Sequence, residues 1–175
     1  NLPFRSGGGL CGSKLPDAQA AYESSNTLQA GLLGGVNFML HSCGWLEGGL
    51  VSSFEKFVMD ADQLGILHSI AEGVDLSEKS QALDAINEVG PGGHFLGCGH
   101  TQNNFKGAFW RSDVFDYKPF ETWQDEGSKD TVIQASERVQ YLLKNYVQPD
   151  IDKGVDEGLR EFIAKAKESN PDKHF

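Results

Sequence analysis

Apolar residues recur along the chain at two spacings, which predict strands and helices in alternation. Residues 36–41 form a short, mostly apolar run after two glycines, as a buried parallel strand does. Residues 2–5 are a second candidate strand. Between the two, Asp17 is a suitable N-cap for a helix that continues to about Leu33. The first forty residues therefore predict a strand, a helix and a second strand.

Helical spacing returns after this region. Residues 50–72 carry apolar side chains at helical spacing, and Gly73 is a suitable stop. Asp75 and Glu78 resemble a capping box for a helix that ends at Val89. We therefore expect two further helices in this part of the chain.

The last part of the chain is predicted to be helical. Residues 94–96 are a candidate short strand, followed by a polar loop over 97–106. Beyond about residue 112 glycine becomes rare, and helices are predicted over 120–126, 130–146 and 152–169. Alternating strands and helices indicate an α/β fold with parallel strands and helical crossovers. Because two or three such units cannot close a barrel, we expect this chain to be part of a longer protein.

Composition and charge exclude several classes of partner. The net charge is −10 and the pI is about 4.8, which disfavours nucleic acid and anionic membrane surfaces as partners. No apolar run approaches the ~20 residues of a membrane span. The three cysteines, Cys11, Cys43 and Cys98, are odd in number and far apart, which disfavours a disulfide framework and suits the reducing cytoplasm. Lys56, Lys106 and Arg111 are interpreted as ordinary surface charges.

Several glycine-rich motifs occur in a fixed order. They are RSGGG at 5–9, SKLPDAQAAYES at 13–24, GVNFMLH at 35–41, GWLEGGL at 44–50 and EVGPGGHFLG at 88–97. In this order they resemble the C-terminal portion of the trimethylamine methyltransferase family, and residues 105–123 continue the match. Each motif alone is weak, whereas the ordered set is specific.

The resemblance implies both a fold and an activity. The fold would be the C-terminal part of a (β/α)8 TIM barrel over residues 1–111, followed by a helical C-terminal extension over residues 112–175. The activity would be transfer of a methyl group from a methylated amine to the Co(I) corrinoid of a separate corrinoid-binding protein. This chain itself would bind no cofactor tightly, and a homo-oligomer remains open. The metal-dependent hydrolases that share the barrel fold are an alternative, as is a non-catalytic homologue that binds methylamines.

The resemblance also bears on the methyl donor. The archaeal trimethylamine enzymes of the family carry pyrrolysine in a loop that would fall near residues 7–12. This sequence has only standard residues there, with Leu10 and Cys11 the nearest candidates. A quaternary amine leaves as a neutral tertiary amine and needs no proton. The expected donor is trimethylamine or, favoured in the absence of pyrrolysine, a quaternary amine such as glycine betaine.

Candidate site residues lie where the predicted strands end, as in parallel barrels. Trp45 could offer an aromatic face to an ammonium group, Glu47 could balance its charge, and His41 could bind a substrate carboxylate. The alternatives are structural roles: Trp45 would anchor a loop, Glu47 would assist the N-cap of the next helix, and His41 would be a buried histidine with its hydrogen bonds satisfied. The predicted catalytic residues are His41 and Glu47, and the predicted substrate-binding residues are Trp45, His100, Gly8, Gly9 and Phe38.

A metal site is considered and not favoured. His94, Cys98 and His100 are residue types that bind zinc, but their spacing fits no standard structural site. A barrel hydrolase would need His41, His94 and His100 to converge on one metal ion. The glycines at 7–9 match no phosphate-binding motif, so a loop that lets a ligand approach the backbone is the favoured interpretation.

Overall fold

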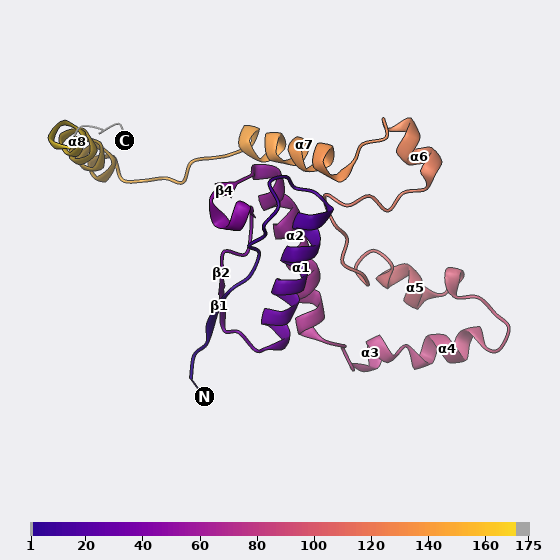
Figure 1. Ribbon diagram of the computed structural model, residues 1–175. Helices are drawn as coiled ribbons and strands as arrows, with labels where there is room; N and C mark the ends of the chain where they lie inside the picture. The colour runs from indigo at the N-terminus through magenta and orange to yellow at the C-terminus, as the bar shows by residue number, and fades with distance from the viewer. Residues whose placement is uncertain (1, 171–175) are drawn as a thin grey trace. The chain divides into compact units, whose positions relative to one another are not determined.

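The computed structural model describes residues 2–170 as short strands, helices and loops (Figure 1). Contacts divide the chain into two compact units, Asn1–Tyr141 and Leu142–Phe175, which are described separately. The division between residues 111 and 112 expected from the sequence stays a prediction. The elements are, in order, β1 (Arg5–Gly7), α1 (Ala18–Leu33), β2 (Phe38–Leu40), β3 (Trp45–Leu46), the 3-10 turn η1 (Glu47–Gly49), β4 (Val51–Ser52), α2 (Phe54–Glu72), α3 (Glu78–Gln81), α4 (Leu83–Val89), the 3-10 turn η2 (Phe95–Gly97), α5 (Gly99–Asn104), α6 (Phe120–Asp125), α7 (Thr131–Lys144) and α8 (Lys153–Ser169).

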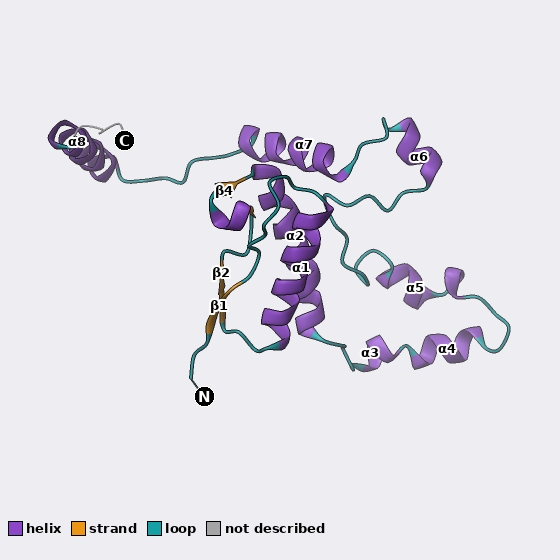
Figure 2. Cartoon of the chain, viewed as in Figure 1, coloured by secondary structure: helices purple, strands orange, loops and turns teal. Residues whose placement is uncertain are grey.

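Strands β1 and β2 pair in parallel, with α1 as the crossover between them (Figure 2). The run at 36–41 therefore contains a strand, as predicted, although only three of its residues pair. The strand expected at residues 2–5 is wrong by about three positions. Ahead of the ladder, the backbone N–H of Phe4 donates to the Asn37 side chain, and the backbone N–H of Asn37 donates to the Phe4 carbonyl. Regular pairing then begins at Arg5, opposite Phe38.

Helix α1 has the predicted bounds, and Asp17 is its N-cap as predicted. The Asp17 carboxylate accepts a hydrogen bond from the backbone N–H of Ala20 at 3.0 Å, and Gly34 closes the C-terminal end. One face of the helix is buried and packs beside α2. The buried residues on this face are Ala20, Ser24 and Leu28.

Helix α2 begins four residues later than predicted, because residues 45–52 form an antiparallel hairpin of β3 and β4. Ser53 caps the helix by accepting a hydrogen bond from the backbone N–H of Lys56 at 3.2 Å. Gly73 ends it with a φ of 75°, in the left-handed region that favours glycine. The predicted stop is therefore confirmed and the predicted start is wrong.

Three predictions between residues 75 and 106 are wrong. The single helix expected up to Val89 is broken into α3 and α4 at Ala82, which has a φ of 54°, and Ser77 rather than Asp75 caps α3. The strand expected at 94–96 is η2, whose turn is closed by a hydrogen bond from the Cys98 backbone N–H to the Phe95 carbonyl. Without a partner strand these three residues cannot form a ladder, so the chain satisfies its backbone hydrogen bonds locally. The expected polar loop contains α5.

The predicted helices near 120 and 130 are confirmed as α6 and α7 within two residues at each end. Before them, a short loop is tied to α2. The Ser112 hydroxyl and the Asp113 backbone N–H both donate to the carboxylate of Asp62. Val114 in this loop is almost completely buried.

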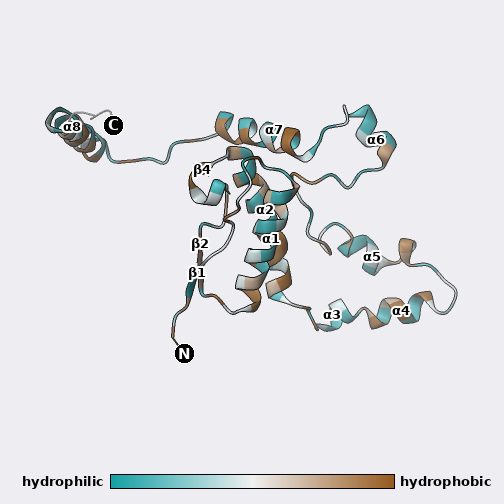
Figure 3. Cartoon of the chain, in the orientation of Figure 1, coloured by the Kyte–Doolittle hydropathy of each residue, from teal (hydrophilic) through white to brown (hydrophobic). Residues whose placement is uncertain are grey.

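In the unit Leu142–Phe175, the predicted helix at 152–169 is confirmed as α8. Asp152 caps it, accepting from the backbone N–H groups of Gly154 and Val155. Figure 3 shows hydrophilic and hydrophobic residues along this helix, whose large apolar side chains are exposed at Val155, Leu159, Phe162 and Ile163. Over residues 2–170, none of the helices combines the length and the apolar character needed to cross a bilayer.

Candidate functional site

The loops that follow β1 and β2 lie against each other. The backbone N–H of Gly9 donates to the His41 carbonyl at 2.8 Å, which extends the parallel pairing beyond the two strands. A Cβ atom at Gly9 would lie 2.5 Å from the Ser42 carbonyl oxygen, so only glycine fits this close approach. The structure therefore brings together two residues, Gly9 and His41, that the sequence placed at separate strand ends.

Gly8 and Gly9 are buried against α1. The Ser24 hydroxyl donates to the Gly9 carbonyl at 3.0 Å, and the Thr27 hydroxyl donates to the Gly8 carbonyl. A Cβ atom at Gly8 would lie 2.7 Å from the Leu28 side chain. These contacts explain both glycines by packing, and their role in substrate binding stays a prediction.

His41 and Trp45 face each other at the end of β2. Their ring centroids lie 5.6 Å apart with an interplanar angle of 73°, an edge-on arrangement. His41 is exposed rather than buried, and its φ of 55° lies in the left-handed region. Non-glycine residues with such a φ are uncommon and gather at functional sites. This chain therefore does not bury His41, and the catalytic role of His41 stays a prediction.

Glu47 shares this unusual backbone, with a φ of 50°. Its backbone N–H donates to the Ser13 carbonyl at 2.8 Å, and the next N–H, of Gly48, donates to the Cys11 carbonyl at 2.7 Å. Within residues 2–170 no hydrogen bond or ion pair is formed by the half-buried Glu47 carboxylate. Its backbone is thus fixed while its carboxylate stays open to a ligand.

An aromatic pocket opens beside Trp45. The hairpin returns the chain so that Ser52 pairs with Trp45, and the N-terminal turn of α2 then places two phenylalanines next to the indole. Phe54 is 70% exposed and Phe57 is 54% exposed. The hollow has a volume of about 310 Å³ and is lined by Cys43, Gly44, Trp45, Ser52, Ser53, Phe54 and Phe57.

The sequence interpretation missed Phe54 and Phe57 as pocket residues. Their helical spacing assigned them to the packed face of a long helix. Their position in the sequence could have indicated this role, because both lie in the first helical turn after the segment that carries Trp45. Residues at the start of the helix that follows a strand-end loop reach the same edge as the loop.

A buried ion pair lies beneath this pocket. Lys56 is 1% exposed, and its ammonium group donates to the Asp60 carboxylate at 2.5 Å and to the Ser24 hydroxyl at 2.8 Å. The same Asp60 oxygen accepts from the Gly44 backbone N–H at 2.9 Å. Burial raises the pKa of the Asp60 carboxyl, and the hydrogen bonds from Lys56 and Gly44 offset part of that rise. The prediction that Lys56 is an ordinary surface charge is wrong, because a one-turn spacing places a carboxylate next to it inside the protein.

The Cys43 thiol provides a test of this buried environment. Burial raises its pKa to about 11, with a further rise from the Asp60 carboxylate and an opposing effect of Lys56. Relative to a thiol with the ordinary pKa of 9.0, its thiolate fraction at about pH 8 falls by about 100-fold. We expect iodoacetamide to label Cys43 at least that much more slowly in the folded full-length protein than in urea, measured by peptide mass spectrometry. Labelling of Cys43 at the unfolded rate would contradict this environment.

The same shift has a consequence for stability. The folded protein holds the Cys43 proton more tightly than the unfolded chain does. Its contribution to stability is therefore present below the ordinary pKa of 9.0 and is lost as the pH rises toward 11.

Two predicted site residues lie away from this pocket. Phe38 is in β2, 60% exposed, on the face opposite Met39, whose sulfur lies against Gly31 of α1. His100 is in α5 instead of at a strand end, and its Nε2 lies 2.8 Å from the Lys79 carbonyl. The structure thus gives His100 a local partner, and its substrate role stays a prediction.

The histidines do not converge on a metal site. In the part of the chain that the structure describes, no group of three or more His, Cys, Asp and Glu side chains is placed to hold a metal ion. His41, His94 and His100 therefore do not form the triad that a metal-dependent hydrolase would need from this chain.

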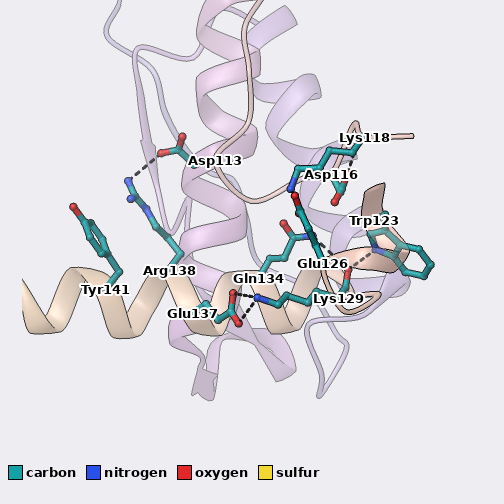
Figure 4. A pocket seen from close by; sticks show the side chains of 10 residues that line it. All are labelled: Asp113, Asp116, Lys118, Trp123, Glu126, Lys129, Gln134, Glu137, Arg138 and Tyr141. Atoms are coloured by element: carbon teal, nitrogen blue, oxygen red, sulfur yellow. Dashed lines mark hydrogen bonds and ion pairs between the residues drawn. The ribbon is translucent and has the colours of Figure 1, made fainter. Parts of the chain in front are cut away.

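A second hollow, of about 310 Å³, lies between α6, α7 and the loop before α6 (Figure 4). Its walls are charged, and the cations are paired within it. Lys118 pairs with Glu126, Lys129 with Glu137 and Arg138 with Asp113, so each of the three cations in the wall has a carboxylate partner. These ion pairs indicate that the charged residues of the hollow stabilise the fold and do not bind a charged ligand.

Comparison with known proteins assigns the chain to a family. The model of the trimethylamine methyltransferase family matches residues 1–171. A glycine betaine methyltransferase of Desulfitobacterium hafniense is 44% identical over 164 residues, which cover 94% of this chain and 34% of that protein. A trimethylamine methyltransferase of Methanosarcina mazei is 32% identical over 167 residues, covering 94% of this chain and 33% of that protein. The chain thus spans about a third of the length of these curated relatives.

These matches cover all the motifs that carried the resemblance, from the glycines after β1 to the residues beyond α5. A second Desulfitobacterium hafniense protein, a trimethylamine methyltransferase, is 28% identical over 168 residues, covering 96% of this chain and 34% of that protein. The resemblance is therefore confirmed: this chain belongs to the trimethylamine methyltransferase family.

Proposed function

We propose that this chain is part of a methyltransferase that moves a methyl group from a quaternary amine, such as glycine betaine, to the Co(I) corrinoid of a partner corrinoid-binding protein. The observation that carries the proposal is the aromatic pocket of Trp45, Phe54 and Phe57 in a chain of this family. The similarity to a protein named glycine betaine methyltransferase supports a quaternary donor.

The proposed fold is the C-terminal part of a (β/α)8 barrel with a helical extension. Its support is the parallel pair β1 and β2 with α1 as crossover, and the position of Met39 toward that helix. In a barrel, residues alternate between the helix layer and the interior. Phe38 lies on the face opposite α1 and is 60% exposed, as expected for an interior position whose other strands lie outside this chain.

The pocket suits a methylated cation. A quaternary ammonium donates no hydrogen bond, so aromatic faces hold it, each contributing roughly 0.5–2 kcal/mol. The open carboxylate of Glu47 would balance its charge, and the exposed ring of His41 would bind the carboxylate of a betaine. The rings of Phe54 and Phe57 would border the methyl group that reacts and reduce its contact with water.

The residues fit a reaction whose nucleophile comes from elsewhere. The corrinoid supplies the nucleophile, a cobalt(I) centre. At neutral pH the pocket thiol, Cys43, keeps its proton because its pKa is about 11, so it does not compete for the methyl group. The carbon–nitrogen bond breaks, its electron pair stays on nitrogen, and the product amine leaves neutral. This chain's side chains therefore orient the donor and need not transfer a proton.

We also propose that the protein is cytoplasmic. The three cysteines of this chain are all free in the structure, which suits the reducing cytoplasm.

The full-length protein, mixed with cob(I)alamin and glycine betaine, is expected to convert the cofactor to its methylated form with release of dimethylglycine. Loss of the cob(I)alamin absorbance and mass spectrometry of the amine measure the two products. A panel of quaternary and tertiary methylamines serves as the specificity control. If no member of the panel is demethylated, the proposal fails, and calorimetric binding of betaine without transfer would favour a non-catalytic homologue.

A further inference from the structure

The buried ion pair joins the two loops that form the candidate site. On one side, Lys56 donates to the Ser24 hydroxyl at 2.8 Å, and Ser24 in turn donates to the Gly9 carbonyl at 3.0 Å. On the other side, Asp60 accepts from the Gly44 backbone N–H at 2.9 Å. The loop after β1 and the loop after β2 are thus connected through one continuous chain of hydrogen bonds inside the protein.

This connection ends next to the pocket residues. Gly44 lies between Cys43 and Trp45, and all three line the aromatic pocket. Gly44 has a φ of 81°, and its carbonyl accepts from the Ser53 backbone N–H at 3.0 Å. Gly44, the residue before Trp45, is therefore held at its N–H by Asp60 of α2 and at its carbonyl by Ser53, the N-cap of the same helix.

Stability alone is a weak reason for a buried ion pair. Removing two charges from water costs free energy, and well-packed apolar residues of similar volume are often as stabilising. What apolar residues cannot supply is an acceptor for Gly44 and a donor for Ser24. The pair is suited to fixing geometry rather than to adding stability.

We infer that Lys56 and Asp60 are positioning residues of the methyl transfer reaction, which hold the Gly8–Gly9 loop and the Cys43–Glu47 loop in register so that Trp45 faces the donor. This inference rests on the proposed function. Neither residue lines the pocket, so both act through Ser24 and Gly44. Small displacements of a bound donor are costly, because a shift of about 1 Å can reduce a rate by about 100-fold.

The test uses the full-length protein with the double substitution Lys56→Met and Asp60→Leu, which removes both charges and keeps a buried apolar volume. We expect kcat per folded protein to fall by about 10- to 100-fold. We also expect the Gly44 N–H to exchange with deuterium faster and Cys43 to be labelled by iodoacetamide at least about 10-fold faster, because the loop loses an anchor. The same readouts are expected to move less in Ser24→Ala, which keeps the ion pair and removes only the connection to Gly9.

Leu67→Ala is the matched control. Leu67 is 4% exposed in the same helix, outside the network, so its truncation destabilises the protein through a cavity. It is expected to leave Cys43 labelling, KM and kcat per folded protein unchanged. A purely structural role for the ion pair would make the double variant behave like this control.

The possible outcomes separate the two proposals. Unchanged Gly44 exchange and Cys43 labelling in the double variant would overturn the inference, as would faster labelling with an unchanged kcat. If the unmodified protein transfers no methyl group from any donor, the proposed function fails and the catalytic role falls with it. The labelling result then still decides whether the pair anchors the loop.

Discussion

Replacing Lys56 by methionine alone is expected to lower the free energy of unfolding by about 3–5 kcal/mol, because the Asp60 carboxylate then stays buried without its counter-charge. Asp60 has a side-chain exposure of only 7%, so water cannot compensate for the lost ammonium group. Urea denaturation of the full-length protein, followed by circular dichroism, measures the change. The double replacement with Asp60→Leu should recover most of the loss.

Two comparisons make this prediction specific. Lys129 pairs with Glu137 at the surface, with side-chain exposures of 39% and 57%, so Lys129→Met should change stability by less than about 1 kcal/mol. The loss caused by Lys56→Met should also shrink as the pH falls, because protonated Asp60 carries no buried charge. A loss no larger than that of Lys129→Met would contradict a buried, closely coupled pair.

Replacing Trp45 by alanine is expected to weaken the binding of glycine betaine by about 10-fold, because one aromatic face of the ammonium pocket contributes roughly 0.5–2 kcal/mol. The His41 ring also loses its edge-on contact with the indole. KM and the calorimetric dissociation constant of the full-length protein are the measurements. Trp45→Phe is the matched variant, and it should retain most of the affinity because it keeps a ring. Equal affinities of the unmodified protein, Trp45→Ala and Trp45→Phe for glycine betaine would show that Trp45 does not bind the donor.

The parts of the fold that depend on neighbouring residues were predictable from the sequence. Helix α1 has its predicted bounds because Asp17 and Gly34 act on backbone groups within one turn of themselves. The end of α2 at Gly73 follows for the same reason. The strand β2 was predicted because its apolar run lies between glycines, and the order of the motifs identified the family that the comparisons confirm.

The parts that depend on distant partners were not predictable. The run at 94–96 has the composition of a strand but no strand to pair with among the described residues, and it forms η2 instead. Lys56 looks like a surface charge in the sequence because its partner Ser24 lies 32 positions away. Its other partner, Asp60, is only one turn away, but Asp60 is bound by the N–H of Gly44, 16 positions before it in the chain. Phe54 and Phe57 have the spacing of a packed helix face, and only the hairpin before them shows that they line a pocket.

The central claim is that the Trp45 pocket binds the positive charge of a methylated ammonium. Calorimetry with the full-length protein can compare glycine betaine with 3,3-dimethylbutanoate, which has the same shape and carboxylate but a neutral carbon in place of nitrogen. The account predicts that betaine binds about 10-fold or more tightly, with the difference reduced in Trp45→Ala. Equal affinities for the two ligands would contradict it.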